Sequence, residues 1–439
     1  MNRFPLFFKT LAIGLLTLLL LIPLSMIEYK ISERQSLQQG VQENIAQSSA
    51  RDQTLSGPYL VLRYQVRETR VEKDKNGKET FTVVTSDPKI KIIEPHALKI
   101  DGNVDVESRK RGIYKAQVFN LHAALNGNFV VPAFEHSENI IPLDAHFIMG
   151  ISDPRGIYKT PTLTLDGKNY EFDAGIAPLE GRGIKVLLPA FNPAQQQSFN
   201  FKFPLDLQGT TALSMRPVGA LTEAHLTSAW PHPSFVGSYL PRERSVSDQG
   251  FDAQWQISGL AKSASAQNGN ERSGETEVFS VSFIDPVNIY LMSERAVKYG
   301  LMFVVLVFTA FFLFEVLRGL RVHPMQYTLV GLGMAMFFLL IISLSEHIPF
   351  AAAYAVSSAA CVLLIGFYLV GVLRSWRPAL LFSGGIALLY GVLYGVLQSE
   401  DNALVMGTLI LFAALATVMM LTRRMDWYKL RGAADESAA

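Results

Sequence analysis

The chain has 439 residues, of which 49% are hydrophobic, and its 39 Lys and Arg residues almost balance its 38 Asp and Glu residues. That balance excludes nucleic acid as an expected partner, because binding a polyanion requires a basic excess. Most charged residues lie between residues 28 and 298, and the sequence on either side is apolar. The single cysteine, Cys361, lies in an apolar run, so the charged region holds no disulfide and is large enough to fold without one.

The first apolar run, Leu6–Ile27, contains no charged residue apart from Lys9. It is long enough to cross a bilayer as a helix, which takes roughly 20 residues. A cleaved signal peptide is the alternative, but the run ends in Leu24-Ser25-Met26-Ile27-Glu28, without the small residues of a cleavage site. We therefore expect residues 1–28 to form a short cytoplasmic start and a retained first transmembrane helix.

Residues 29–298 are predicted to form a β-rich domain. Apolar residues on one helical face continue the first helix to about Ser48, and Gly57-Pro58 ends the helical character. Asn76-Gly77 then predicts a hairpin between strands at 59–71 and 81–85. Turn residues at 101–103, 152–156 and 166–168 separate further strand candidates at 89–93, 112–125, 197–207, 224–230, 251–257 and 278–284. This pattern favours a mostly antiparallel, sandwich-like domain of one lobe or two, in which residues 262–276 form a loop rich in Ser, Gly and Asn.

Five more apolar runs predict a transmembrane bundle over residues 299–421. They cover residues 299–317, 327–344, 350–373, 379–397 and 403–421, and Glu315 is the only charged residue within them. With six spans, the loops that carry Lys and Arg all fall on one side of the membrane. The positive-inside rule then places both termini, including the tail 422–439, in the cytoplasm. The predicted fold class is an α + β membrane protein with six transmembrane helices, whose residues 29–298 lie in the periplasm of a cell with two membranes.

The charged domain shows no pattern of catalytic or metal-binding residues. No pair of histidines has a spacing that places two metal ligands beside a carboxylate. His225 and His232 are close in sequence, but the turn-like Trp230-Pro231-His232-Pro233 lies between their local structures, so structural roles are favoured over a metal site. Ser234 lacks the flanking glycines of a nucleophile elbow. We expect no catalytic residue, cofactor or metal, and hence no enzyme.

Two acidic residues near the spans have a structural and a functional interpretation. Glu315 lies three residues before Arg318, so a local ion pair is favoured over a proton relay. Glu346-His347 lies at a helix end that water can reach. Ion-coupled transport usually needs charges near the middle of the membrane, which these positions do not supply.

Basic and small residues also have two interpretations. Arg109-Lys110-Arg111 is predicted to be a solvated loop rather than a site for anionic lipid or polymer. Gly331-Leu332-Gly333 and Gly391-Val392-Leu393-Tyr394-Gly395 predict helix faces that pack closely, and the alternative is a transport path lined by small residues.

Short strings distributed along the chain resemble the CreD family of bacterial inner-membrane proteins. The most specific are Trp230-Pro231-His232-Pro233-Ser234-Phe235 and His323-Pro324-Met325-Gln326-Tyr327. The others are Leu21-Ile22-Pro23-Leu24, Ser56-Gly57-Pro58, Arg111-Gly112-Ile113-Tyr114, Asp153-Pro154-Arg155-Gly156-Ile157, Ser345-Glu346-His347 and Asp426-Trp427-Tyr428. The resemblance implies an inner-membrane protein of cell-envelope integrity, controlled by a sensor kinase and response regulator and linked to colicin tolerance and the β-lactam response. It implies no catalytic or ligand residues.

Three classes of function follow from these observations. A non-enzymatic inner-membrane protein of envelope integrity and envelope-stress response is favoured by the resemblance. A membrane transporter or channel with a periplasmic accessory domain is the alternative, weakened by the scarcity of charges within the spans. An extracytoplasmic enzyme has no supporting motif. The expected partners are the lipid bilayer and envelope proteins or cell-wall components.

Overall fold

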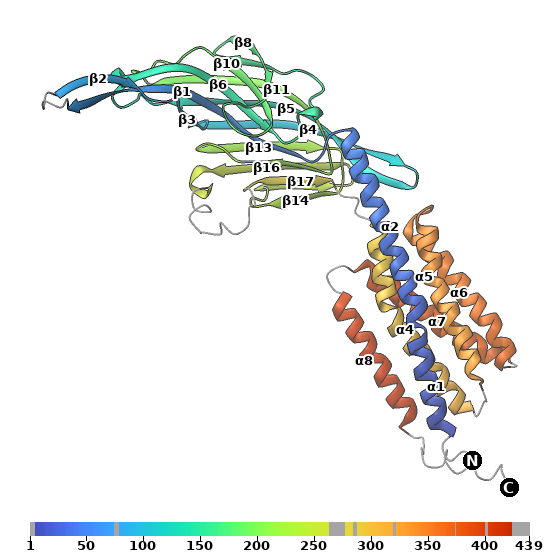
Figure 1. Cartoon of the computed structure of the whole chain (residues 1–439). Helices are drawn as coiled ribbons and strands as arrows, with labels where there is room; N and C mark the ends of the chain where they lie inside the picture. The colour runs from blue at the N-terminus through green and yellow to red at the C-terminus, as the bar shows by residue number, and fades with distance from the viewer. Residues whose placement is uncertain are drawn as a thin grey trace, which may run out of the picture. The chain divides into compact units, whose positions relative to one another are not determined.

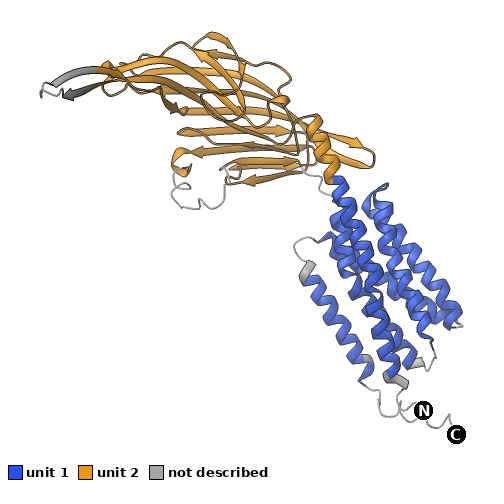
Figure 2. Ribbon diagram, viewed as in Figure 1, with its two compact units in different colours: residues 1–38, 287–439 blue, residues 39–286 orange. Residues whose placement is uncertain are grey.

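The computed structural model describes residues 5–73, 79–262, 277–283, 288–318, 322–373, 375–399 and 403–423. The chain divides into two compact units (Figure 2). A helical unit comprises residues 1–38 and 287–439, and a sandwich unit comprises residues 39–286. The predicted Asn76-Gly77 turn, and the predicted loop 262–276 apart from Lys262, lie outside the described residues.

Apolar helices form the helical unit (Figure 1). The first two, α1 (Pro5–Leu19) and α2 (Leu21–Ser48), follow each other with only Leu20 between them. The others are α4 (Ile289–Arg318), α5 (Pro324–Ser345), α6 (Phe350–Leu373), α7 (Trp376–Gln398) and α8 (Ala403–Thr422). The start of α5 shows why a helix begins there: Pro324 occupies the first turn, and His323 and Gln326 form a capping box.

In the described ranges, five helical stretches are long and apolar enough to cross a membrane: residues 8–48 and helices α4 to α7. Helix α8 contributes a shorter apolar stretch, Val405–Met420, so six spans remain a prediction. The predicted helical continuation to Ser48 is confirmed, and α4 begins at Ile289 rather than Tyr299. Gly57-Pro58 does not end the helix; it lies inside a strand, where the register with the neighbouring strand shifts.

Two β-sheets form the sandwich unit (Figure 1). Sheet A has the order β14-β17-β12-β1-β6-β10-β9, with β2 and β3 also paired to β1. Its strands are β1 (Gln53–Lys73), β2 (Glu79–Thr85), β3 (Lys89–Ile93), β6 (Ile140–Ile151), β9 (Asp173–Ala174), β10 (Gly183–Leu188), β12 (Ala212–Met215), β14 (Pro233–Gly237) and β17 (Phe279–Phe283).

Sheet B has the order β15-β16-β13-β4-β5-β11-β7-β8. Its strands are β4 (Ala97–Arg111), β5 (Tyr114–Val131), β7 (Thr162–Leu165), β8 (Lys168–Glu171), β11 (Gln197–Thr210), β13 (Leu221–Ser228), β15 (Glu243–Ser247) and β16 (Gly250–Ser258). Most described neighbours are antiparallel, whereas β1 with β12 and β4 with β13 run parallel. Two short 3-10 helices lie in the connections before and after β6. They are η1 (Ser137–Asn139) and η2 (Pro154–Gly156).

One hydrophobic core lies between the two sheets. Side chains alternate along each strand, so every second residue of β13 and of β16 is buried while the others reach the surface. Aromatic rings join the sheets at the centre: Phe147 of β6 packs edge-on against Phe129 of β5 and Phe203 of β11. The expected mostly antiparallel sandwich is therefore present, with a single shared core.

The strand predictions succeed where the alternation is strong. The hairpin of β1 and β2 is confirmed by its antiparallel register, and β3 has the predicted bounds. The predicted turn at Asp101-Gly102-Asn103 is wrong, because these residues lie inside β4. Gly102 is closely packed there: a Cβ on it would lie 2.9 Å from Leu226 and 3.1 Å from Leu121.

Candidate functional site: a helix latch and two interhelical contacts

The end of helix α2 is held against the sandwich by apolar packing. Within the sandwich unit, Val41 and Ile45 of α2 pack on Ala116 and Val118 of strand β5. These residues recur at helical spacing on α2 and on one face of the strand, so both elements present an apolar stripe at this place. This apolar packing holds the last turn of α2 next to polar residues of the sandwich unit.

A buried carboxylate, Asp153, lies at this helix end. Its oxygens accept hydrogen bonds from Arg155 Nε at 2.8 Å, Arg155 Nη2 at 2.5 Å and the Arg51 backbone N–H at 3.2 Å. The Arg155 guanidinium is the main reason that the pKa of Asp153 is lowered to about 2. Arg155 Nη1 also donates to the Gln47 carbonyl at 2.9 Å, which satisfies one of the free carbonyls at the end of α2.

A fully buried amide, Gln53, connects this carboxylate segment to both sheets. Gln53 belongs to β1 of sheet A, and its Nε2 donates to the Asp153 carbonyl at 3.0 Å and to the Gln208 carbonyl at 2.8 Å. Gln208 belongs to β11 of sheet B. Gly156 is required beside it, since a Cβ there would collide with the Gln208 carbonyl oxygen. We call Gln47, Arg51, Gln53, Asp153, Arg155 and Gly156 the helix latch.

The β4–β5 hairpin reaches the other side of the helix end. Its two-residue turn begins at Gly112, whose φ of 63° suits glycine. Arg111 donates to the Asn44 side chain, and Arg109 Nη1 lies 3.4 Å from Ser49 Oγ. The predicted loop at 109–111 is wrong, because these residues form the end of strand β4. The predicted solvation is confirmed, since all three side chains are exposed, and the two arginines hold α2.

In the helical unit, Glu315 of α4 is buried and has three partners. It accepts hydrogen bonds from Lys9 of α1, from the Val322 backbone N–H at 2.9 Å and from Tyr327 Oη of α5 at 2.9 Å. The Lys9 ammonium also donates to the Val322 carbonyl at 2.9 Å. The predicted pairing with Arg318 lies outside the described side chains. Sequence spacing could not reveal Lys9, which is 306 positions away.

A second acidic residue, Glu346, lies at the opposite end of α4 and α5. It is the C-cap of α5, and Tyr290 Oη of α4 donates to its Oε1 at 3.2 Å. Arg34 Nε of α2 lies 3.6 Å from the same oxygen. The predicted solvent access is wrong for Glu346, whose side chain is 8% exposed, while His347 is exposed. Each interhelical contact, at Glu315 and at Glu346, thus joins three helical segments.

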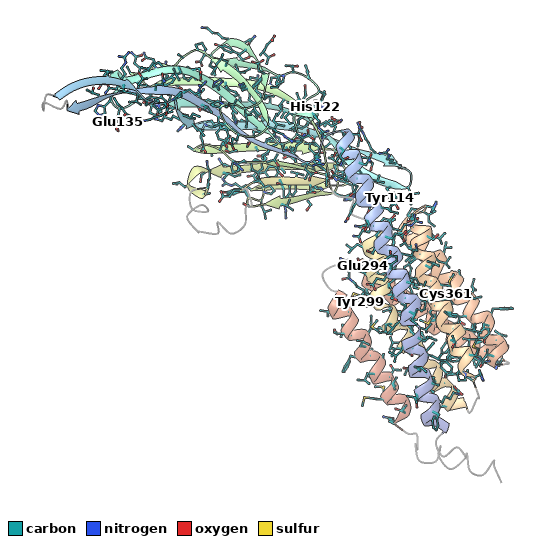
Figure 3. The ribbon with its side chains drawn as sticks, viewed as in Figure 1. Tyr114, His122, Glu135, Glu294, Tyr299 and Cys361 are labelled. Atoms are coloured by element: carbon teal, nitrogen blue, oxygen red, sulfur yellow. The ribbon has the colours of Figure 1, made fainter. Side chains whose placement is uncertain are left out.

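A smaller polar group lies between α5, α6 and α7. Cys361 Sγ (Figure 3) is 3.2 Å from the Gly333 carbonyl and 3.2 Å from Tyr390 Oη. Tyr354 Oη donates to the Tyr390 carbonyl at 2.6 Å. Ser357 is fully buried, and its hydroxyl has no hydrogen-bond partner in the part of the chain that the structure describes.

Close helix packing was predicted for two strings that contain glycines, and the structure supports it for one of them. Gly331 allows close approach, because a Cβ on it would collide with Leu20 and lie 2.9 Å from Phe308. The prediction for Gly391 and Gly395 is wrong. Among the described residues, nothing lies within 4 Å of a Cβ on Gly391, and only Met406, at 3.7 Å, meets one on Gly395.

Two histidines of the sandwich unit lie between pairs of carboxylates: His225 between Asp101 and Asp252, and His122 between Asp105 and Asp206. His225 Nε2 lies 3.0 Å from Asp252, whereas the His232 carbonyl accepts from Trp230 Nε1 at 3.0 Å, so the two histidines have different partners. His122 (Figure 3), not singled out in the sequence, lies 2.8 Å from Asp206. Among the described residues, no group of three or more His, Cys, Asp or Glu side chains is arranged to hold a metal ion.

A polar hollow of about 310 Å³ lies over β4, β13, β15 and β16, next to His225. Its side chains bond to one another: Arg242 Nη1 donates to Gln256 at 2.5 Å, and Gln256 Nε2 donates to Glu223 at 3.3 Å. Charged and amide side chains and the His225 imidazole supply most of its polar lining.

Comparisons with known proteins agree with this arrangement. Residues 5–428 match the family model of the inner membrane protein CreD. The chain is 37% identical to inner membrane protein CreD of Escherichia coli K12, over 98% of this chain and 95% of that protein. The chain therefore belongs to the CreD family of inner membrane proteins.

Similarity to solved structures is weak. A zinc metallopeptidase of the M1 class from Deinococcus radiodurans aligns with a TM-score of 0.19 at 8% identity, over 43% of this chain and 42% of that one. A substrate-bound mutant of it aligns with a TM-score of 0.20 at 9% identity, over 75% of this chain and 94% of that one. Neither value supports a shared fold.

Four of the eight strings that carried the family resemblance lie at the contacts described above. Arg111–Tyr114 forms the hairpin turn beside α2, and Asp153–Ile157 contains the latch carboxylate. His323–Tyr327 caps α5 and supplies the hydroxyl on Glu315, and Ser345–His347 contains Glu346. Asp426-Trp427-Tyr428 lies outside the described residues.

Proposed function

We propose that this member of the CreD family is a non-enzymatic inner-membrane protein that maintains the cell envelope and acts in the envelope-stress response. The observation that carries the proposal is the helix latch. The family strings around Asp153 and Arg111 contribute groups that bond to the protein itself, namely to the end of α2 and to Gln53. Such residues fix an element in place, whereas catalytic residues present a free reactive group to a substrate.

Helix α2 gives the latch a role in coupling. The helix starts in the helical unit, and its residues 39–48 belong to the sandwich unit. The latch attaches this helix end to β1 of sheet A and to β11 of sheet B through Gln53. We infer that the sandwich binds envelope proteins or cell-wall components, and that a change in the sandwich reaches the membrane helices through α2.

Complementation tests this role. A strain lacking the gene receives the wild type, Asp153→Asn, or the control Asp248→Asn, which changes an exposed carboxylate in a turn. We expect the wild type and the control to restore β-lactam tolerance and exclusion of an impermeant dye, and Asp153→Asn to restore them poorly at an equal amount of protein in the membrane. Full restoration by Asp153→Asn would refute the role of the latch.

The proposal places both termini in the cytoplasm and residues 29–298 in the periplasm, as the distribution of Lys and Arg favours. Single cysteines at Asn76, Ser399 and Ala434, in a background with Cys361 replaced, test this sidedness in intact spheroplasts. An impermeant thiol reagent should label the first two positions and not the third. Labelling at Ala434 would contradict the orientation.

A transporter or channel is the second candidate, and one observation favours it. Polar groups lie inside the helical unit, including the buried Glu315 and the buried hydroxyl of Ser357 without a described partner. Intramembrane polar residues often mark a transport path. Ion and solute flux measured in proteoliposomes distinguishes the two functions. Flux that Glu315→Gln abolishes would favour transport, and its absence favours the envelope role.

A further inference from the structure

The sandwich unit contains an apolar cavity of about 230 Å³ between its two sheets. Leu62 and Phe147 of sheet A and Phe129 of sheet B form its inner wall, and all three side chains are fully buried. Protein interiors rarely leave an apolar void much larger than a water molecule. An apolar void of this size accepts an apolar molecule.

The cavity opens to solvent at the β7–β8 hairpin and the segment after β10. Pro189, Ala190 and Lys168 line it and are exposed, so they form the mouth. The inner wall is buried and apolar, whereas the mouth is exposed and partly charged. A ligand that fits both parts has an apolar portion and a polar end.

Lys168 gives the mouth its charge. In the register of sheet B, Lys168 pairs with Leu165, which pairs with Phe201, so the lysine lies in the row of side chains on the core face. No hydrogen bond or ion pair joins its ammonium to the described part of the chain. The nearby Asp166 carboxylate accepts from the Asn200 backbone N–H at 2.8 Å, which fixes it against β11 while it keeps its negative charge. The Lys168 ammonium is therefore the group of the mouth that is available to an anionic ligand.

We propose that this cavity binds one acyl chain of an anionic lipid, with the chain in the cavity and the charged head group at Lys168. The volume exceeds the ~150 Å³ that admits benzene. It is below the ~300 Å³ at which pockets for larger, drug-sized ligands begin. A single thin chain fits this size better than a ring system or a pair of chains. The buried aromatic wall provides its apolar contacts.

Photocrosslinking to the full chain in neutral nanodiscs tests the proposal. The probes are a medium-chain fatty acid, whose length matches the cavity, with a diazirine near its chain end, and the methyl ester of the same compound. After irradiation, peptide mapping should find adducts of the acid on β6, β10 or the 189–199 segment. The ester should label the same peptides about five-fold less, the effect of losing one partly exposed ion pair.

Four variants distinguish the cavity from incidental labelling. Ala190→Trp blocks the mouth from an exposed position, and Ala145→Leu fills the cavity from inside. Both should remove the sandwich adducts, while adducts on the helical unit persist. Lys168→Glu should lower labelling by the acid about five-fold and leave the ester unchanged. Lys202→Glu is the matched control, because Lys202 pairs with Thr164 and so lies on the opposite face of the sheet.

Three results would overturn the proposal. They are adducts confined to the helical unit, sandwich adducts that survive both Ala190→Trp and Ala145→Leu in folded protein, and equal effects of Lys168→Glu and Lys202→Glu. Tryptophan fluorescence melting of each variant shows whether it is folded.

Discussion

The two units both bury a carboxylate, but they satisfy it in different ways. Asp153 in the sandwich unit has its charged partner, Arg155, two positions away, and it also accepts from the Arg51 backbone N–H, 102 positions away. Glu315 in the helical unit has its charged partner, Lys9 of α1, 306 positions away, although Val322 and Tyr327, 7 and 12 positions away, also donate to it. Local partners are present whenever the turn forms, whereas distant partners require the whole bundle to assemble. The comparison predicts that losing the carboxylate costs more in the helical unit.

Glu315→Gln should have the largest effect. The change leaves the Lys9 ammonium without its counter-charge in an apolar unit, and breaking a buried pair on one side costs about 3 to 5 kcal/mol. Thermal unfolding of the full chain in nanodiscs measures the loss. The double variant Lys9→Met, Glu315→Leu should recover much of it, because no lone charge remains.

Glu346→Gln is the matched control for this prediction. Its partners lie farther away, at 3.2 Å for Tyr290 Oη and 3.6 Å for Arg34 Nε, and the Arg34 side chain is 45% exposed. The loss should be clearly smaller. Equal losses for the two glutamates would break the distinction between a close pair with a largely covered lysine and a longer pair with a half-exposed arginine.

Asp153→Asn should destabilise the sandwich unit by about 1 to 2 kcal/mol, the range for a charge-assisted hydrogen bond with a half-exposed arginine. Because the pKa of Asp153 is lowered to about 2, its contribution is fully present above the usual value near 3.8. It is lost as pH falls from about 4 towards 2. Fluorescence melting followed through the buried Trp255 should show this acid loss in the wild type and not in Asp153→Asn.

Gly331→Ala and Gly391→Ala form a matched pair inside the helical unit. The first places a methyl group against Leu20 and Phe308 and should cost about 1 kcal/mol or more through overpacking. The second meets nothing within 4 Å and should be neutral or slightly stabilising, because alanine favours a helix. Similar unfolding temperatures for both variants would show that the side chains around Gly331 accommodate the methyl group without loss of stability.

The sequence predicts an element well when the interactions that stabilise the element lie within it, and poorly when they come from distant parts of the chain. Helices α5, α6 and α7 begin and end within a few residues of the predicted spans, because length and apolarity alone define them. Strands β4 and β6 were missed, since a strand such as β4 gains its stability from β5 and β13 rather than from its own residues.

The candidate site was predictable only in part, for the same reason. The strings around Asp153 and Tyr327 marked the right positions, but their roles come from Gln53, Gln47 and Glu315, which lie elsewhere in the chain. Gly391 and Gly331 have similar sequence settings, and only the packing of Leu20 separates them. A single sequence contains no signal for such a contact.

The smallest expected effect concerns His146 on the outer side of sheet A. The side chain is buried, and its Nε2 lies 3.0 Å from Asp144 Oδ1 in an orientation that makes no hydrogen bond. Burial lowers the pKa of His146, and the positive charges of Lys185 and Arg63 act in the same direction, while Asp144 opposes them. The unfolded chain therefore binds a proton at this position more readily than the folded chain does.

The sign of the pH dependence follows directly. Above the ordinary histidine pKa near 6.5, both states are neutral at this position and nothing is lost. As pH falls below that value, protonation favours the unfolded state, so the sandwich unit loses stability. His146→Gln should remove this loss and leave the lower-pH loss at Asp153 in place. The measurement is the melting temperature of the wild type and of His146→Gln from pH 8 to pH 5, followed through Trp255. Identical slopes in the two proteins would mean that another group titrates in this range and that His146 keeps an ordinary pKa despite its burial.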